Sequence, residues 1–208
     1  MKNNPTNLPA QVIDVRPRDE MLHKKWKPKI NGVTPSGNSH FVFSNRHEEE
    51  AFYSYQFDTD EKKKRYKEYR EAWWQRAAEY EHGDAPLALI VELVSTCNLA
   101  CTMCFTITDK FQNSVTGATR MIPWSQFTKI IDDAKDCGVY SILLSWRGEA
   151  TLYRVKDENG EIKTFGDAIK YACSKNFLEV TSLTHGQNLT DELIEDILDA
   201  QPNWISFS

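Results

Sequence analysis

The chain has 208 residues, of which 40% are hydrophobic and 26% charged, and its formal net charge is −5. This length and composition suit one globular domain with an appendage. The acidic balance gives no support to a nucleic-acid binder, because such proteins usually present a basic face. The N-terminus lacks the apolar stretch of a signal peptide, and no window approaches the roughly 20 apolar residues of a membrane helix. We therefore expect a cytoplasmic protein with reduced thiols and no membrane or nucleic-acid partner.

The first quarter of the chain shows no sustained hydrophobic period. Prolines and glycines interrupt residues 1–57, which we expect to form an extended arm with short strands near 11–15 and 40–44. Residues 58–86 are expected to form a helix, from Asp58 to about Glu81, and a linker. Aromatic and apolar residues recur along this helix at steps of three and four, and we interpret the stripe as a packing face. Its members are Tyr66, Tyr69, Trp73, Ala77 and Tyr80.

Residues 87–208 alternate between apolar runs and amphipathic segments. Strands are predicted at 87–95, 139–145, 178–184 and 204–208. Helices are predicted from Pro123, near 165–175, and after Thr190, which can cap the last of them. We expect inward-facing residues on the first and third of these helices, namely Trp124, Phe127, Ile130, Ile131, Ala134, Leu193, Ile194, Ile197 and Leu198. This order predicts an α/β fold with a parallel sheet, and a fourth strand at the end of the sequence suggests the front part of a longer protein.

Three of the five cysteines fall within eight positions, at Cys97, Cys101 and Cys104. They follow the first predicted strand, at the sheet edge where α/β proteins build their sites. Soft thiolate ligands select zinc, copper(I) or iron–sulfur centres. Structural zinc usually takes four ligands, and a cubane cluster normally takes four cysteines, so a set of three leaves one position open. Cys137 and Cys173 fall on predicted helices and are expected to be buried free thiols.

The spacing Cys-x3-Cys-x2-Cys after the first strand resembles that of the radical S-adenosylmethionine enzymes, possibly those of the SPASM-like type. "SWRGEATL" (145–152), after the second strand, is similar to the family's Gly-Gly-Glu-Pro motif. "TSLTHGQNLT" (181–190) resembles its third-strand Thr-Asn-Gly stretch, and "WISFS" (204–208) resembles its fourth strand. The resemblance covers residues 87–208 and implies the first four strands of a partial (β/α)6-type barrel.

The resemblance also implies a chemistry. A [4Fe–4S] cluster on Cys97, Cys101 and Cys104 would bind S-adenosylmethionine at its open iron. A reductant such as flavodoxin or ferredoxin would supply the electron that cleaves it to a 5′-deoxyadenosyl radical, which takes hydrogen from a small-molecule or peptide substrate. Glu149, beside Gly148, matches the glutamate that bonds the methionine amino group, and Ser208 matches a polar residue near the ribose. No catalytic residue beyond these binding residues is assigned.

Several positions depart from the family pattern. Arg147 stands at the first glycine of the motif and Ala150 at its proline, and Arg147 suits a cofactor carboxylate or a structural ion pair equally. Met103 lies where an aromatic residue often packs near the adenine, and a methionine can still pack on a ring. Phe105 could substitute for it, but core packing is the favoured interpretation of Phe105. His185 replaces the asparagine of Thr-Asn-Gly, and a hydrogen-bonded histidine at the strand end is the favoured interpretation.

Two alternatives stay open at this stage. One is a zinc-stabilised binding module that recruits a partner through the aromatic helix. The other is an iron–sulfur electron-transfer protein that leaves S-adenosylmethionine intact. Metal content and S-adenosylmethionine cleavage distinguish the three hypotheses.

Overall fold

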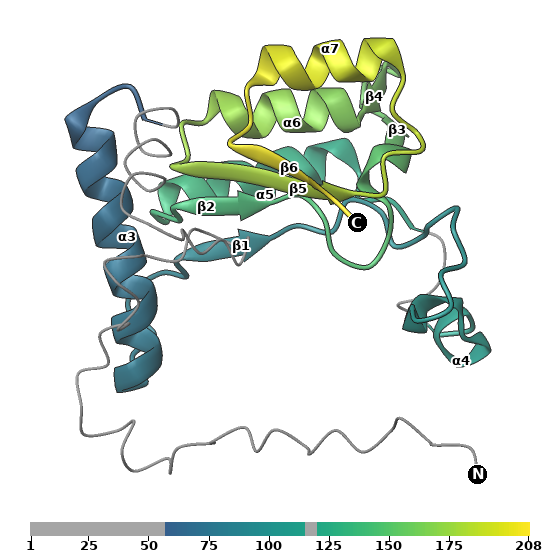
Figure 1. Ribbon diagram of the computed structural model, residues 1–208. Coiled ribbons are helices and arrows are strands. Elements are labelled where there is room, and N and C mark those ends of the chain that lie inside the picture. The colour runs from purple at the N-terminus through teal and green to yellow at the C-terminus, as the bar shows by residue number, and fades with distance from the viewer. Residues whose placement is uncertain (1–56, 115–119) are drawn as a thin grey trace, which may run out of the picture.

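The computed structural model describes residues 57–114 and 120–208 (Figure 1). The short strands predicted near 11–15 and 40–44 lie outside these residues. Within the two described ranges, no helix combines the length and the apolar character needed to cross a membrane.

A four-stranded parallel sheet organises the chain. Its strands are β1 (Ala88–Ile90), β2 (Ser141–Leu143), β5 (Glu179–Thr184) and β6 (Trp204–Phe207), hydrogen-bonded in that order. The helices α5 (Trp124–Asp136), α6 (Phe165–Ser174) and α7 (Asp191–Ala200) connect them. The predicted parallel α/β arrangement is therefore confirmed. The described strands do not close into a barrel, so a barrel is not part of what the structure shows.

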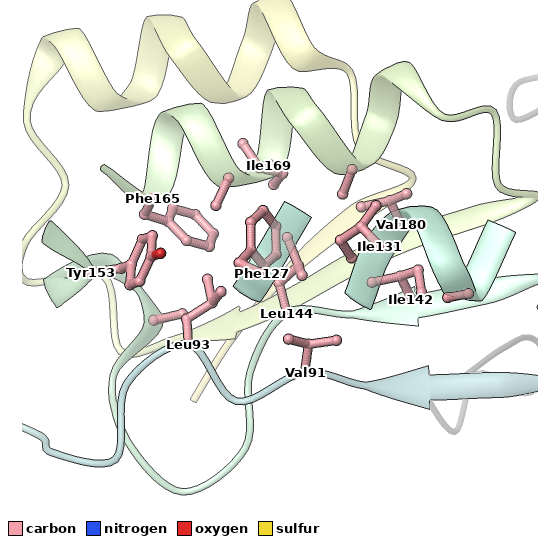
Figure 2. Close-up of a cluster of buried hydrophobic side chains, with 14 of the residues drawn as sticks. Val91, Leu93, Phe127, Ile131, Ile142, Leu144, Tyr153, Phe165, Ile169 and Val180 are labelled. Carbon is pink, nitrogen blue, oxygen red and sulfur yellow. The ribbon is translucent and has the colours of Figure 1, made fainter. Parts of the chain in front are cut away.

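The main hydrophobic core lies between the sheet and helices α5 and α6 (Figure 2). Phe127 and Ile131, one helical turn apart on α5, and Ile142 on β2 are all fully buried. Trp124 and Ile130 pack against this core as predicted, and so do Leu193 and Ile197 of α7. The prediction was wrong for Ile194 and Leu198, which are 40% and 67% exposed, because the inward stripe of α7 is narrower than its apolar sequence.

Helix α3 (Asp60–Glu79) covers the opposite end of the sheet from the cysteines. Tyr66 and Tyr69 are buried against Leu87 and Leu178, which immediately precede β1 and β5. The ring of Tyr69 stacks on Tyr140, which precedes β2, at 5.4 Å between centroids. The packing interpretation of the aromatic stripe is thus confirmed for Tyr66, Tyr69 and Trp73. The stripe ends before Tyr80, the left-handed C-cap, which is 65% exposed, and the side chain of Ala77 lies outside those described.

The loops contain short elements that the sequence analysis did not predict. A hairpin of β3 (Arg154–Lys156) and β4 (Ile162–Thr164) occupies the stretch predicted as a loop. A carboxylate oxygen of Asp157 accepts the backbone N–H groups of Asn159 and Glu161 and so fixes its turn. The remaining short elements are η1 (Phe105–Ile107), α4 (Asp109–Gln112) and η2 (Ala150–Leu152).

The first strand is shorter than the predicted 87–95. β1 ends at Ile90, which is 44% exposed, and so is not buried on both faces. Beyond it, Val94 forms an isolated antiparallel bridge with Met121. The apolar run therefore changes partner from β2 to the segment 120–122 as it approaches the cysteines.

Thr190 provides a test of the local structure around α7. Its hydroxyl accepts the N–H of Leu193, as predicted for an N-cap. Thr190→Ala is expected to lower the free energy of unfolding by about 1 kcal/mol, measured by urea denaturation followed by circular dichroism. Thr128→Ala, which removes a hydroxyl inside α5 bonded only to the Ser125 carbonyl, should cost nothing comparable. Equal losses in the two variants would contradict the capping role.

Candidate functional site

The three segments with motif resemblance meet at the carboxyl ends of the parallel strands. The cysteine segment follows the run that begins with β1, residues 145–153 follow β2, and residues 185–190 follow β5. This edge is where parallel α/β sheets hold their ligands.

Gly148 packs backbone against backbone on the segment that leads to Cys97. A Cβ atom at this position would overlap the carbonyl oxygen of Val94 and would lie 2.6 Å from the oxygen and 2.8 Å from the nitrogen of Thr96. The next residue, Glu149, donates its backbone N–H to the Thr96 carbonyl at 2.9 Å. Only glycine permits so close an approach, and the contact fixes the motif loop one residue away from Cys97.

Glu149 carries a buried carboxylate, only 4% exposed. Its Oε1 accepts the hydroxyls of Thr151 and Thr184, each at 2.5 Å, and the backbone N–H of Thr151 at 3.2 Å. Its Oε2 accepts the backbone N–H of His185 at 3.1 Å. Burial alone would raise the pKa of this carboxyl, but these hydrogen bonds outweigh it and lower the pKa below its usual value. The site therefore holds an ionised carboxylate out of water.

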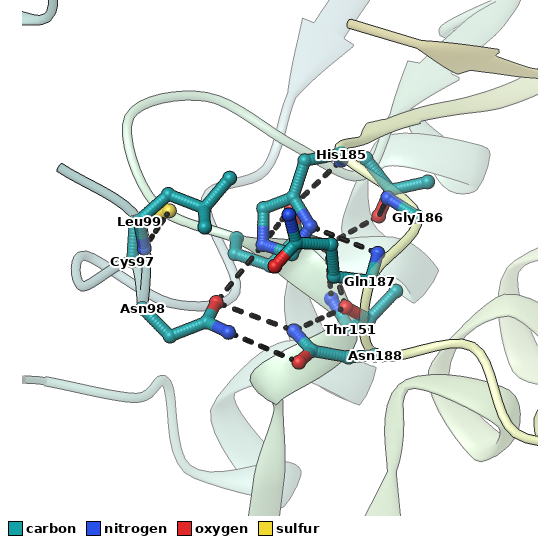
Figure 3. Close-up of polar contacts among 10 residues, drawn as sticks. Cys97, Asn98, Leu99, Thr151, His185, Gly186, Gln187 and Asn188 are labelled. Carbon is teal, nitrogen blue, oxygen red and sulfur yellow. Dashed lines mark hydrogen bonds and ion pairs between the residues drawn. The ribbon is translucent and has the colours of Figure 1, made fainter. Parts of the chain in front are cut away.

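His185 links this carboxylate to the cysteine segment (Figure 3). Its Nδ1 accepts the backbone N–H of Gln187 at 3.0 Å, so the neutral ring carries its proton on Nε2. Nε2 in turn donates to Oδ1 of Asn98 at 2.9 Å and lies 3.4 Å from Oε2 of Glu149. The favoured interpretation of His185 as a hydrogen-bonded histidine at the end of a strand is confirmed.

Asn98 is the centre of a second set of contacts between the loops. Its Nδ2 donates to Oδ1 of Asn188 at 3.1 Å, and Nδ2 of Asn188 donates to the hydroxyl of Thr151 at 3.2 Å. Because Asn98 adjoins Cys97, the loops after β2 and β5 together hold the start of the cysteine segment in place.

The three cysteines are free thiols with different surroundings. Cys97 and Cys104 are half-buried and Cys101 is exposed. The sulfur of Cys97 accepts the backbone N–H of Leu99 at 3.4 Å, and that of Cys104 lies 2.9 Å from the hydroxyl of Thr106. One turn joins two of them, since the N–H of Cys104 bonds the Cys101 carbonyl at 2.9 Å.

The three thiols are suitable ligands for a soft metal, but in this structure they are not arranged around a single point. Three free thiols within eight residues are suitable ligands for such a centre. Hydrogen bonds of the kind seen at Cys97 and Cys104 also accompany sulfur ligands of iron–sulfur clusters. Over residues 57–114 and 120–208, however, no three His, Cys, Asp or Glu side chains lie close enough together to hold one ion.

Ser208 and Met103, the other two residues predicted to contact the cofactor, differ in their surroundings. The backbone N–H of Ser208 donates to the Thr184 carbonyl at 3.1 Å. Ser208 therefore lies beside the threonine whose hydroxyl donates to Glu149. Met103 is 86% exposed and Phe105 58% exposed; Phe105 instead contacts the ring of Phe111, at 5.2 Å between centroids. In this structure, then, the side chains at 103 and 105 are largely open to solvent.

Arg147 forms a structural ion pair, one of the two roles considered for it. Its Nε and Nη2 bind the two carboxylate oxygens of Glu92 at 2.7 and 2.6 Å. Ala150, where the family has proline, is 2% exposed and belongs to the core.

The two remaining cysteines differ from each other. Cys137 is exposed at the end of α5, which corrects the prediction that it is buried. Its C-cap position places it where the helix leaves the core. Cys173 on α6 packs partly against the core, and burial raises the pKa of its thiol to about 12.

Sequence reasoning missed most of the residues that position the site. Thr151, Thr184 and Asn188 lie inside the quoted motif stretches, but nothing in their spacing assigned them a role. Asn98 falls between two cysteines, and Glu92 is a lone acid in an apolar run. That isolated charge was the one signal that could have suggested a partner such as Arg147.

Comparison with known proteins adds no assignment, since no protein-family model and no curated protein matches the chain.

Proposed function

We propose that the chain is the cluster-binding part of a radical S-adenosylmethionine enzyme. The observation that carries the proposal is the position of Glu149. Its carboxylate is buried and ionised, and its backbone is bonded to the residue before Cys97. A carboxylate on a loop bonded to the start of a thiol triplet suits a ligand that carries an amine and binds a metal through it.

Each residue of the site then has a definite task. Cys97, Cys101 and Cys104 would hold a [4Fe–4S] cluster, which when bound and reduced supplies the electron for cleavage of S-adenosylmethionine. Oε2 of Glu149 accepts one N–H at 3.1 Å, while Oε1 accepts three groups, so Oε2 is the oxygen with acceptor capacity left for an amine N–H. Gly148 and Asn98 hold the loops after β2 and β5 against the cysteine segment.

The charge balance of the site supports a cationic ligand. The only basic side chain that the structure places near the Glu149 carboxylate, among the described residues, is His185 at 3.4 Å. Hydrogen bonds rather than a fixed cation keep this carboxylate ionised, so a ligand amine would meet a preformed anion.

The proposal is tested by reconstitution of the full chain without oxygen, with iron and sulfide. We expect about four irons per chain, S-adenosylmethionine binding, and release of 5′-deoxyadenosine on reduction. Stoichiometric zinc without iron in protein purified without oxygen would replace the proposal with the zinc-stabilised binding module. A cluster that leaves S-adenosylmethionine intact under reduction would replace it with an electron-transfer role.

Glu149→Gln separates the role of the carboxylate from assembly of the cluster. The amide loses the negative charge and offers an N–H group where Oε2 accepts one, so we expect S-adenosylmethionine to bind about tenfold or more weakly. Iron content should be unchanged. The matched control is Glu158→Gln, an exposed acid of the β3–β4 turn. Unchanged affinity in Glu149→Gln would refute the assigned contact.

The same pair of variants has a signature in stability against pH. Because the folded pKa of Glu149 is lowered, its carboxylate stabilises the fold above its unfolded pKa of about 4.3, and this contribution is lost as pH falls through the folded value. Urea midpoints between neutral pH and acid should therefore fall less steeply in Glu149→Gln than in Glu158→Gln.

A further inference from the structure

A cavity of about 450 Å³ lies beside the candidate site, at the outer edge of the first strand run. The segment 120–122 forms one side of it and is bonded to that run, since the N–H of Ser95 donates to the Arg120 carbonyl at 3.0 Å and the N–H of Ile122 to the Leu93 carbonyl at 3.1 Å. Glu92 and Arg147 form another side, and the first turn of α5 contributes Gln126. The volume is in the range of small-molecule sites.

Arg147 presents unused donors at this cavity. It binds Glu92 side-on through Nε and Nη2, and Glu92 also accepts the backbone N–H of Arg147 at 3.1 Å. This geometry uses two of the five guanidinium N–H groups and leaves three, two on Nη1 and one on Nη2. The ring of Phe111, 5.7 Å from the guanidinium carbon, holds its plane in place. The cation is thus fixed in orientation and still able to donate.

Arg120 and Gln126 supply further donors. Both side chains are exposed, and over residues 57–114 and 120–208 neither forms a hydrogen bond or an ion pair. With Arg147 and Arg120 positive and Glu92 negative, the charged groups that line the cavity sum to one positive charge. The first turn of α5 contains no acidic residue, and Pro123 provides no side-chain cap, so nothing there opposes an anion.

The cavity also has an apolar wall, formed by Met121, Ile122 and Pro123. Met121 and Ile122 are half-buried and pack against the main core, so this wall is fixed. A ligand that matches both sides has a planar anionic head for the guanidinium groups and an apolar body.

We propose that this cavity binds a small organic carboxylate with an apolar body. It shares two loops with the candidate site, because Ser95 precedes Cys97 by two residues and Arg147 precedes Glu149 by two. We assign this carboxylate as the substrate, or the part of the substrate that anchors it; that assignment rests on the proposed function, whereas the binding itself does not.

The binding is measured on the full chain without iron or S-adenosylmethionine, so that its outcome is independent of the cluster chemistry. Acetate, hexanoate and inorganic phosphate are titrated separately, and the backbone amide signals of Met121, Ile122 and Gln126 are followed by nuclear magnetic resonance. Hexanoate should bind about tenfold or more tightly than acetate, because its added methylenes meet the apolar wall.

Two variants assign the site. Arg120→Gln should weaken hexanoate about tenfold through loss of a charge-assisted bond, whereas Arg65→Gln, an exposed arginine on α3, should not. Gln126→Glu adds a negative charge to the lining and should abolish binding, whereas Ser125→Glu adds the same charge to the same helix turn outside the lining. A smaller effect from Ser125→Glu separates the cavity from the helix terminus alone.

Three results would overturn the inference. One is hexanoate affinity equal to that of acetate, and another is phosphate bound more tightly than hexanoate. The third is equal binding by Arg120→Gln and the parent chain. None of these depends on whether the chain assembles a cluster, so failure here and failure of the proposed function are distinguishable.

Discussion

Cys97→Ala, Cys101→Ala and Cys104→Ala are each expected to abolish assembly of the [4Fe–4S] cluster. Three thiolates are the whole protein contribution to the proposed centre, so each loss leaves only two ligands. Iron and sulfide content after anaerobic reconstitution, together with visible absorbance, measures the effect, and near-complete loss is expected in all three variants.

The cysteine experiment has a built-in control for folding. Cys101 is exposed and the other two thiols are half-buried, so none fills the core, and the far-ultraviolet circular dichroism should be unchanged. Cys137→Ala removes an exposed thiol at the end of α5 and should keep the full iron content. A variant lacking Cys97, Cys101 or Cys104 that still assembled the same cluster would exclude these thiols as the ligand set.

Under the proposed function, the cysteine segment has to move for a cluster to form. The three thiols are not grouped around one point, and those of Cys97 and Cys104 contact only groups of their own segment, Leu99 and Thr106. These are single contacts to sulfur, which cost little to rearrange. The β2 and β5 loops, by contrast, are already joined to Thr96 and Asn98. The fold therefore fixes the start of the segment, and under the proposed function the cluster would set the positions of the three thiols.

The order of helices and strands could be predicted because their hydrophobic periods are regular. Phe127, Ile131 and Ala134 repeat at helical spacing, and each is buried on α5. The first strand was harder, because an apolar run does not reveal which partner each part of it pairs with. Its second half bonds to Met121 and its neighbours, and that pairing depends on a distant segment. The β3–β4 hairpin escaped prediction because its two strands are three residues each and largely polar.

For the candidate site too, the sequence pattern predicted the motif residues but not the contacts that hold them. Cysteine spacing and strand order identify Cys97 and Glu149 as residues of one edge. The contacts that hold them, from Asn98, Thr184 and His185, are side-chain hydrogen bonds between loops far apart in the sequence. Such partners depend on loop geometry, which local sequence does not encode. Nor could the sequence show that Arg147 pairs with Glu92, a contact that the geometry establishes.

Gly148→Ala is expected to be the most damaging single substitution at the site. The added Cβ would overlap the Val94 carbonyl and crowd the backbone of Thr96, and neither can yield as a flexible side chain would. The loop after β2 must then separate from the cysteine segment, which breaks the bond from Glu149 N–H to Thr96. We expect a loss of about 3 kcal/mol in the free energy of unfolding, measured by urea denaturation.

The matched control for Gly148→Ala is Gly138→Ala. Gly138 has a φ of 82°, and a Cβ there meets nothing within 4 Å, so its cost is conformational alone, about 1 kcal/mol. The two variants thus separate backbone strain from a steric clash between loops. Only Gly148→Ala should also shift the amide signals of Asn98 and His185 in the nuclear magnetic resonance spectrum, because only that clash parts the loops they join. Equal stability losses without those shifts would show that the contact between residues 148 and 94–96 does not hold the candidate site together.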